Sequence, residues 1–173
     1  MYSVNGQVNR EHKLKTGLLI GRFQPFHKGH DYLIKKALGQ VDKLIIAIGS
    51  SNVKDTDNPF TYPQRKKILE IYIENEDMEN KIVKIFPLPD NPSDDVWVRN
   101  AVKKAGRIDV IISNNELNVN RFFEKAGFKV LRFPFYKRNI YEGKKIRDLA
   151  RHGKRWDKRV PNVLAPVIQK LLV

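Results

Sequence analysis

A chain of 173 residues is long enough for one domain with a substantial buried core, and its 41% hydrophobic and 30% charged residues are ordinary for a globular protein. It contains no cysteine, which excludes disulfides, thiolate zinc sites and a cysteine nucleophile. Its 33 Lys and Arg outnumber its 19 Asp and Glu, and the net charge of +14 favours anionic partners such as phosphorylated metabolites, nucleic acid or acidic lipid.

The N-terminal residues 1–16 are polar and lack the apolar core of a secretory signal. We expect them to form a loose arm or an added edge element, and residues 17–173 to form a single domain that includes the C-terminal helices. No apolar run approaches the roughly 18 residues of a membrane span, so we expect no membrane association. Together with the lack of cysteine, these features favour a cytoplasmic protein.

Five short segments rich in Ile, Val, Leu and Phe are predicted to be buried strands of a parallel sheet. They are residues 16–23, 43–51, 81–88, 109–115 and 129–135. Amphipathic segments between and after them predict helices. These lie before Gly39, after Pro63, after Ser93 or Asp94, and at 118–126, 143–152 and 161–172. The alternation predicts an α/β fold with a Rossmann-like, doubly wound parallel sheet, in which ligands bind at the carboxyl ends of the strands.

The stretch "GRFQPFHKGH" at 21–30 follows the first predicted strand and contains two histidines, His27 and His30. They could bind a metal, pack at a helix start, or donate to a phosphate. A metal site needs more ligands, and no Glu or Cys stands at matching spacing nearby. A helix start offers free N–H groups and a positive dipole end, Gly29 allows close approach to the backbone, and imidazoles three apart share one helix face. The phosphate interpretation therefore explains most of the stretch.

The segment His27-Lys28-Gly29-His30 resembles the HxGH motif of the nucleotidyltransferase superfamily. Its ten-residue context closely resembles the opening of archaeal-type nicotinamide-nucleotide adenylyltransferases. Further segments are similar to that family in the same order along the chain, and the resemblance covers about residues 17–172. They are "IGSS" at 48–51, "NPFTYPQR" at 58–65, "VWV" at 96–98 and "YEGKKIR" at 141–147.

The resemblance implies an HxGH nucleotidyltransferase fold that transfers the adenylyl group of ATP to nicotinamide mononucleotide, giving NAD and pyrophosphate, with Mg²⁺ accompanying ATP. It also implies a homo-oligomer, with a hexamer expected for archaeal-type members. Nucleic acid is not expected as a partner, but it is not excluded. His27, His30 and Arg147 are the implied catalytic residues. Arg22, Ser50 and Trp97 would bind the mononucleotide, and no metal site made by the protein itself is expected. The residues expected to bind ATP are Gly21, Arg22, Phe23, Gly29, His30, Asn114, Tyr141, Gly143, Lys144, Lys145, Ile146 and Arg147.

Several of these positions also have a purely structural explanation. Trp97 lies at helical spacing with apolar neighbours and could be a core residue, Arg147 could be an exposed helix charge, and Arg65 could support the fold through an ion pair. Two segments depart from the family pattern. Lys144 replaces the hydroxyl residue usual after the glycine of the late signature, where Glu142 precedes that glycine.

The second departure is Asp57-Asn58, which stands where archaeal-type members often carry an arginine and an aspartate; Lys54 could supply the missing positive charge. Two other functions therefore remain open. One is a nucleotidyltransferase that acts on another phosphorylated acceptor. The other is a non-catalytic protein of the same fold that binds nucleotides or RNA.

Overall fold

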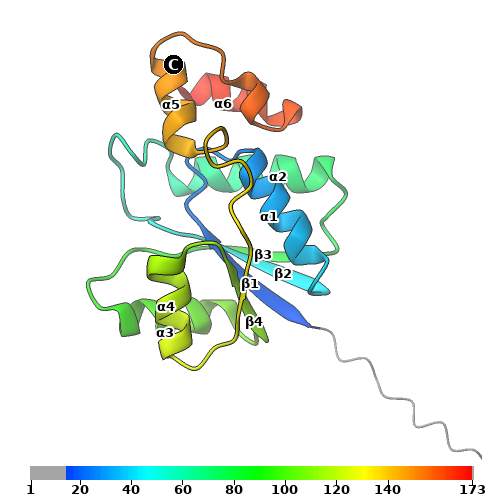
Figure 1. The fold of residues 1–173 in the computed structure, drawn as a ribbon, viewed down its shortest axis with the longest axis vertical. Coiled ribbons are helices and arrows are strands. Elements are labelled where there is room, and N and C mark those ends of the chain that lie inside the picture. Colours follow the sequence, from blue (N-terminus) through cyan, green and yellow to red (C-terminus); the bar gives the residue numbers. More distant parts are fainter. Residues whose placement is uncertain (1–14, 173) are drawn as a thin grey trace, which may run out of the picture.

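In the computed structural model, which describes residues 15–172, the sheet has five parallel strands in the order β3-β2-β1-β4-β5. Figure 1 labels the first four strands of the chain, β1 to β4. The strands are β1 (Thr16–Gly21), β2 (Lys43–Ile48), β3 (Ile82–Pro87), β4 (Val110–Ser113) and β5 (Val130–Arg132). All five predicted strands and the doubly wound parallel sheet are confirmed. The predicted arm lies almost wholly outside the described residues, and its last residue, Thr16, already belongs to β1.

In the described part of the chain, six α-helices connect and follow these strands. They are α1 (Lys28–Leu38), α2 (Tyr62–Asn75), α3 (Asp94–Ala105), α4 (Arg121–Lys125), α5 (Gly143–Arg151) and α6 (Ala165–Leu172). The Ser93 side chain caps α3 by accepting a bond from the N–H of Val96, as its position before the helix predicts. The helix expected at 118–126 is instead divided, because a π-helical turn, Glu116–Asn120, precedes α4. Among the described residues, no helix is long and apolar enough to cross a membrane.

Both faces of the sheet are buried, and they form two separate apolar cores. Because side chains alternate along a strand, Leu19 enters the core beneath α1, α2, α5 and α6, whereas Leu18 enters the core beneath α3 and α4. The same alternation divides Ile46 from Ile45 in β2. Burial on both faces explains why the strands appear in the sequence as continuous apolar runs rather than as alternating ones.

The strand order reverses direction at β1. The chain moves from β1 through α1 and α2 to β2 and β3 on one side, and then crosses to β4 and β5 on the other side. The loops that leave β1 and β4 therefore diverge at the carboxyl edge of the sheet, which is where sheets of this kind bind their ligands. The histidine-containing segment 22–27 follows β1, and Asn114 follows β4.

Candidate active site

The two histidines of the first loop together cap the N-terminus of α1. The N–H of Gly29 donates to Nδ1 of His27 at 3.1 Å, and the N–H of His27 donates to Nδ1 of His30 at 3.3 Å. The two rings are stacked with their centroids 3.8 Å apart. Because each Nδ1 accepts a backbone N–H, the proton of each neutral ring lies on Nε2. The cap therefore leaves the Nε2–H group of each ring as a donor at a helix N-terminus, which suits an anion better than a metal ion.

Both imidazoles are neutral near pH 7. Burial lowers the pKa of His27 to about 4. The pKa of His30 is also well below its usual value, because the ring is buried and because His27 lies beside it. The rings of Phe23 and Phe26 supply much of this burial, with centroids 4.7 and 5.5 Å from that of His30. These histidines can thus donate hydrogen bonds to a phosphate, but the positive charge of the site must come from elsewhere.

Glycine is required at position 29 because a side chain there would collide with the neighbouring His27 ring, whether or not a ligand is bound. A Cβ atom there would lie 2.9 Å from the His27 ring, so any side chain would push the imidazole out of its capping position. Gly21 has a similar role, since its Cβ would lie 2.7 Å from the ring of Phe23. Phe23 itself has a φ of +54°, a left-handed conformation that is costly for a bulky residue. The loop therefore depends on tight packing of its own side chains.

Arg65 is a buried connector between two strand-end loops. Its side chain is 0% exposed. Nη1 donates to the carbonyls of Arg22 and Gly49 at 2.7 Å each, and Nη2 donates to the carbonyl of Ser50 at 3.1 Å. Burial lowers the pKa of Arg65 to about 10. The structural explanation is thus confirmed, but within residues 15–172 no carboxylate forms the expected ion pair with Arg65. Backbone carbonyls, which cluster where parallel strands end together, take its place.

Helix α5 begins directly against the histidine loop. A Cβ on Gly143 would lie 2.6 Å from the carbonyl oxygen of Gln24, so a glycine is needed at this contact. One turn later, Nη1 of Arg147 donates to the same carbonyl at 2.7 Å. The Gln24 amide is itself held by the backbone of Phe60, at 2.9 and 3.0 Å. Arg147 is buried, so its interpretation as an exposed helix charge is wrong.

The remaining residues of the late signature lie around the start of α5. The side chain of Glu142 makes no capping hydrogen bond and instead lies 3.6 Å from Nζ of Lys145. Lys144 is exposed in the first turn, and Ile146 is buried in the core. The N–H groups that open α5 are therefore without a side-chain cap, and a positive side chain stands beside them, an arrangement that favours an anion.

Residues expected at the mononucleotide side are more widely spread. Arg22 is exposed, and its Nη1 lies 3.5 Å from Oδ1 of Asn58. Ser50, with a φ of +47°, donates from Oγ to Asp90 at 3.1 Å and so ties the loop after β2 to the loop after β3. Trp97 packs edge-on against Phe122 and Phe123, with centroids 6.2 and 5.9 Å away, but remains partly exposed. Its stacking role stays a prediction, as does the role of the half-buried Asn114.

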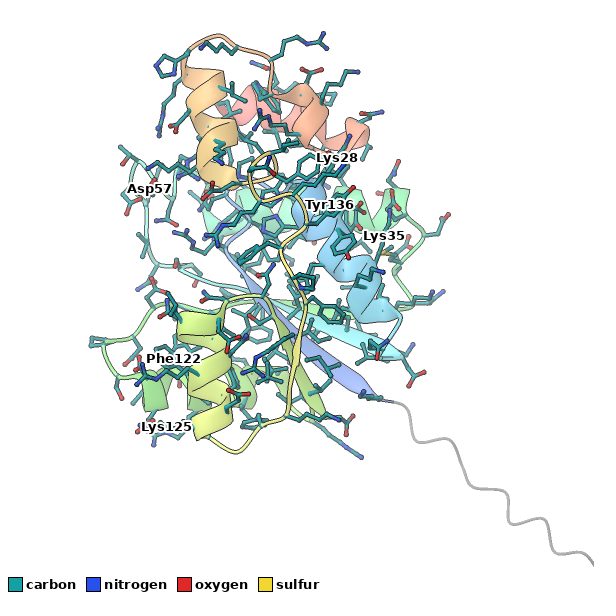
Figure 2. All side chains as sticks on the ribbon, in the orientation of Figure 1. Lys28, Lys35, Asp57, Phe122, Lys125 and Tyr136 are labelled. Atoms are coloured by element: carbon teal, nitrogen blue, oxygen red, sulfur yellow. The ribbon has the colours of Figure 1, made fainter. Side chains whose placement is uncertain are left out.

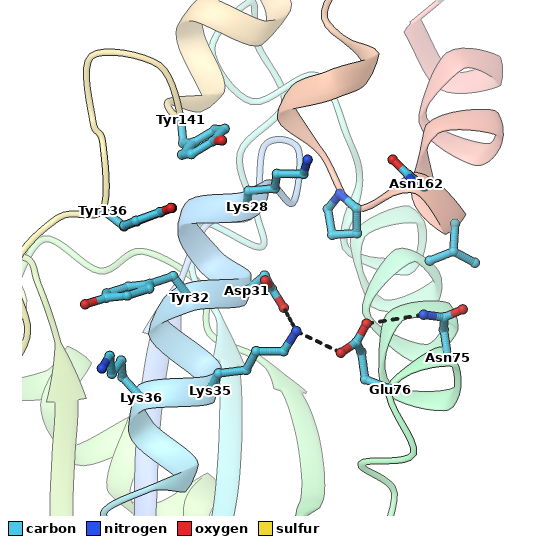
Figure 3. A pocket seen from close by; sticks show the side chains of 12 residues that line it. Lys28, Asp31, Tyr32, Lys35, Lys36, Asn75, Glu76, Tyr136, Tyr141 and Asn162 are labelled. Carbon is cyan, nitrogen blue, oxygen red and sulfur yellow. Dashed lines mark hydrogen bonds and ion pairs between the residues drawn. The ribbon is translucent and has the colours of Figure 1, made fainter.

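A cavity of about 810 Å³ lies along the outer face of α1, next to the histidine loop (Figure 3). The rings of Tyr32, Tyr136 and Tyr141 are stacked along one side, with centroids 4.5 and 5.6 Å apart. On the other side, Lys35 bridges Asp31 and Glu76 at 2.9 and 2.8 Å. The expected ATP residue Tyr141 thus faces this cavity and lies near Gly29.

The contacts of two residues near the site, Asp57 and Gln24, were not identified from the sequence. Asp57 accepts from Nη2 of Arg147 at 2.7 Å, and Figure 2 shows it on the loop that faces α5. Gln24 connects the histidine loop to both Phe60 and Arg147. Their partners lie 36 to 123 residues away in the chain, and no local pattern signals such contacts.

Neutral histidine donors, two helix N-termini and two arginines at the carboxyl edge of a doubly wound sheet define a nucleotide-binding α/β protein. A family model described as cytidylyltransferase-like matches residues 18–149, and the chain belongs to this family. Among curated relatives, the nicotinamide-nucleotide adenylyltransferase of Archaeoglobus fulgidus is 38% identical over 156 residues, covering 88% of this chain and 89% of the relative. That of Halorubrum lacusprofundi is 35% identical and covers 90% and 86%. The predicted superfamily is confirmed.

Solved structures show the same similarity. A bifunctional NMN adenylyltransferase/ADP ribose pyrophosphatase from Francisella tularensis superposes with a TM-score of 0.73 at 27% identity, covering 85% of this chain and 45% of that one. A second structure of this kind from the same organism, complexed with AMP and a manganese ion, gives a TM-score of 0.71 at 27% identity, with 92% and 52% covered. This chain spans about half the length of those two proteins.

Proposed function

We infer that this protein transfers the adenylyl group of ATP to nicotinamide mononucleotide and releases pyrophosphate, forming NAD. The observation that carries this inference is the histidine cap of α1, which presents two Nε2–H donors beside the first N–H groups of a helix. The curated relatives with nicotinamide-nucleotide adenylyltransferase names support ATP and this acceptor as the substrates.

The reaction needs positioning and charge stabilisation more than covalent chemistry. A phosphate oxygen of the mononucleotide forms a bond to the α-phosphorus of ATP, while the bond from that phosphorus to the bridging oxygen breaks and pyrophosphate leaves. His27 and His30 donate to the ATP phosphates, and His30 stabilises the charge that develops on transfer. Arg22 binds a substrate phosphate with its planar fork of donors, and Arg147 and the N-terminus of α5 bind the leaving end.

Magnesium enters this scheme as part of the nucleotide substrate. In the part of the chain that the structure describes, no three His, Asp or Glu side chains converge on a possible metal position. The histidines and arginines of the site bind phosphate oxygens rather than a metal. They therefore fit an ion that is held mainly by phosphate oxygens and water, which is how Mg²⁺ usually binds with nucleotides. The ion would neutralise phosphate charge, while the histidines and arginines orient the phosphates.

The direct test is NAD formation from ATP, Mg²⁺ and nicotinamide mononucleotide. The His30→Asn variant keeps an acceptor for the N–H of His27 but loses the Nε2–H donor. We expect its kcat to fall roughly 100- to 1,000-fold, the usual loss for one donor to a developing charge, with little change in melting temperature. A folded wild-type protein that forms no NAD refutes the proposal, and a panel of other phosphorylated acceptors, followed by pyrophosphate release, then identifies the true one.

The remaining parts of the proposal concern the whole protein. We propose that residues 17–173 form one domain, that the chain forms a homo-oligomer, and that it acts in the cytoplasm. Light scattering of the purified protein measures the oligomeric state. A monomer at micromolar concentration would contradict that part of the proposal without affecting the reaction.

A further inference from the structure

The ion pair between Arg147 and Asp57 joins a buried cation to an exposed anion. Nη2 of Arg147 lies 2.7 Å from Oδ1 of Asp57, and the two side chains are 6% and 64% exposed. A buried guanidinium needs a partner, because an uncompensated charge away from water is costly. The carboxylate that neutralises Arg147 therefore lies on the solvent side of the guanidinium.

Asp57 occupies a donor of Arg147 that a ligand could otherwise use, and it is a side chain that can move. Nη1 is bound to the backbone carbonyl of Gln24, in the loop that holds the histidine cap. Nε is buried without a hydrogen-bond partner among the described residues. Nη2 carries two N–H groups, and the one that donates to Asp57 becomes available to a phosphate only when that carboxylate moves away.

The surrounding loop allows that movement without unfolding. The backbone N–H of Asp57 donates to Oδ1 of Asp55 at 2.8 Å, and the carbonyl of Thr56 accepts from Nη2 of Arg151 at 2.7 Å. These bonds hold the backbone of the loop, whereas the Asp57 side chain is held by its bond to Arg147. A change of side-chain rotamer into solvent is therefore enough to expose the guanidinium.

We propose that Asp57 sets the affinity for ATP, because it occupies a donor of Arg147 in place of a phosphate and competes with the incoming nucleotide. The proposal rests on the proposed function, in which Arg147 binds the phosphates of ATP. A triphosphate carries more negative charge than one carboxylate and offers more acceptor atoms, so it can replace Asp57. A nucleoside without phosphates cannot do so. Every phosphorylated ligand that uses Arg147 thus binds against the competition of Asp57.

The test compares Asp57→Asn with the wild-type protein by direct binding of ATP and of adenosine, measured by calorimetry. Asparagine has nearly the same shape but no charge, so it competes less strongly for Arg147. We expect the variant to bind ATP about five- to tenfold more tightly, an effect limited by the exposure of the carboxylate. Adenosine should bind equally to both proteins, because it does not need Arg147.

The matched control is Asp157→Asn, which removes an equal charge from an exposed pair with Arg155 that, among the described residues, makes no hydrogen bond with the Asp57 loop. We expect it to leave the affinity for ATP unchanged within twofold. ATP affinity that is unchanged or weaker in Asp57→Asn, with adenosine binding intact, overturns the inference. If Asp57→Asn does not fold, Asp57→Ser is measured against the same criteria. A wild-type protein that binds no ATP instead refutes the proposed function.

Discussion

Replacing Arg65 should disturb the active site through the two loops that Arg65 holds, although Arg65 itself is not expected to contact a substrate. The guanidinium is the shared donor for three carbonyls in the loops after β1 and β2. Arg65→Met keeps much of the side-chain volume but removes every one of these donors. Arg65→Lys keeps the charge but offers a single nitrogen, which cannot reproduce the planar arrangement of two.

The size of the effect follows from the three bonds. Each buried carbonyl left without a donor costs about 1–3 kcal/mol, and the bonds to Arg22 and Ser50 are only partly buried, so we expect a total loss of about 3–5 kcal/mol for Arg65→Met. In a protein of this size that lowers the melting temperature by about 10 °C. Because the two loops also carry Arg22 and Ser50, a shift of about 1 Å should reduce kcat/KM on the order of 100-fold.

Urea unfolding and steady-state kinetics, both well below the melting temperature, measure the two effects. Arg155→Met is the control, because that arginine is 77% exposed in a pair with Asp157, and its loss should change stability by less than about 0.5 kcal/mol. We expect Arg65→Lys to fall between the wild type and Arg65→Met in both assays. An Arg65→Lys variant with wild-type stability and kcat/KM would show that the carbonyl contacts do not hold the loops.

Two further predictions concern acid stability and the acceptor. His27 has a pKa of about 4 in the folded protein, below the ordinary 6.5, so the folded state resists protonation and its stability is complete above pH 6.5. Stability should fall progressively as the pH drops from about 6.5 to about 4, by roughly 3 kcal/mol for this group, and urea titrations of His27→Gln should show a flatter pH profile. Trp97→Ala should raise the KM for the mononucleotide far more than the KM for ATP. Trp97→Phe keeps an aromatic ring, so its KM for the mononucleotide should stay close to that of the wild type. Equal increases in both KM values would make Trp97 a core residue only.

The parallel sheet was predictable because each strand is a short apolar run that ends in Gly, Pro, Ser or Asn, and each helix has its own periodicity. The histidine loop was predictable as well, because all its residues are adjacent in the sequence. The hydrogen bonds of Arg65 could not be predicted, because its acceptors lie 15 to 43 residues away in the chain. They are also backbone carbonyls, which every residue carries, so the residue type gives no sign of them. Helical spacing alone also cannot show which face of α3 is covered, and for this reason the role of Trp97 remained open.

The partner of Asp57 could not be predicted from the sequence either. Its position just before Asn58-Pro59-Phe60 marks it as a departure from the family pattern, but the sequence gives no indication of which cation it meets. The structure pairs it with Arg147, 90 residues further along the chain. An aspartate at position 57, where archaeal-type members often carry an arginine, thus pairs with the arginine of another segment, Arg147. This pairing can be recognised only in the folded structure.

The histidine cap has a consequence for the timing of entropy loss. Both rings are fixed by backbone N–H groups and by each other, so their orientation and tautomers are set when the protein folds. An arriving phosphate does not have to immobilise these two side chains, and that part of the ordering cost is absent from the binding step. Since both rings are already neutral, the number of protons they hold also stays constant across the physiological pH range.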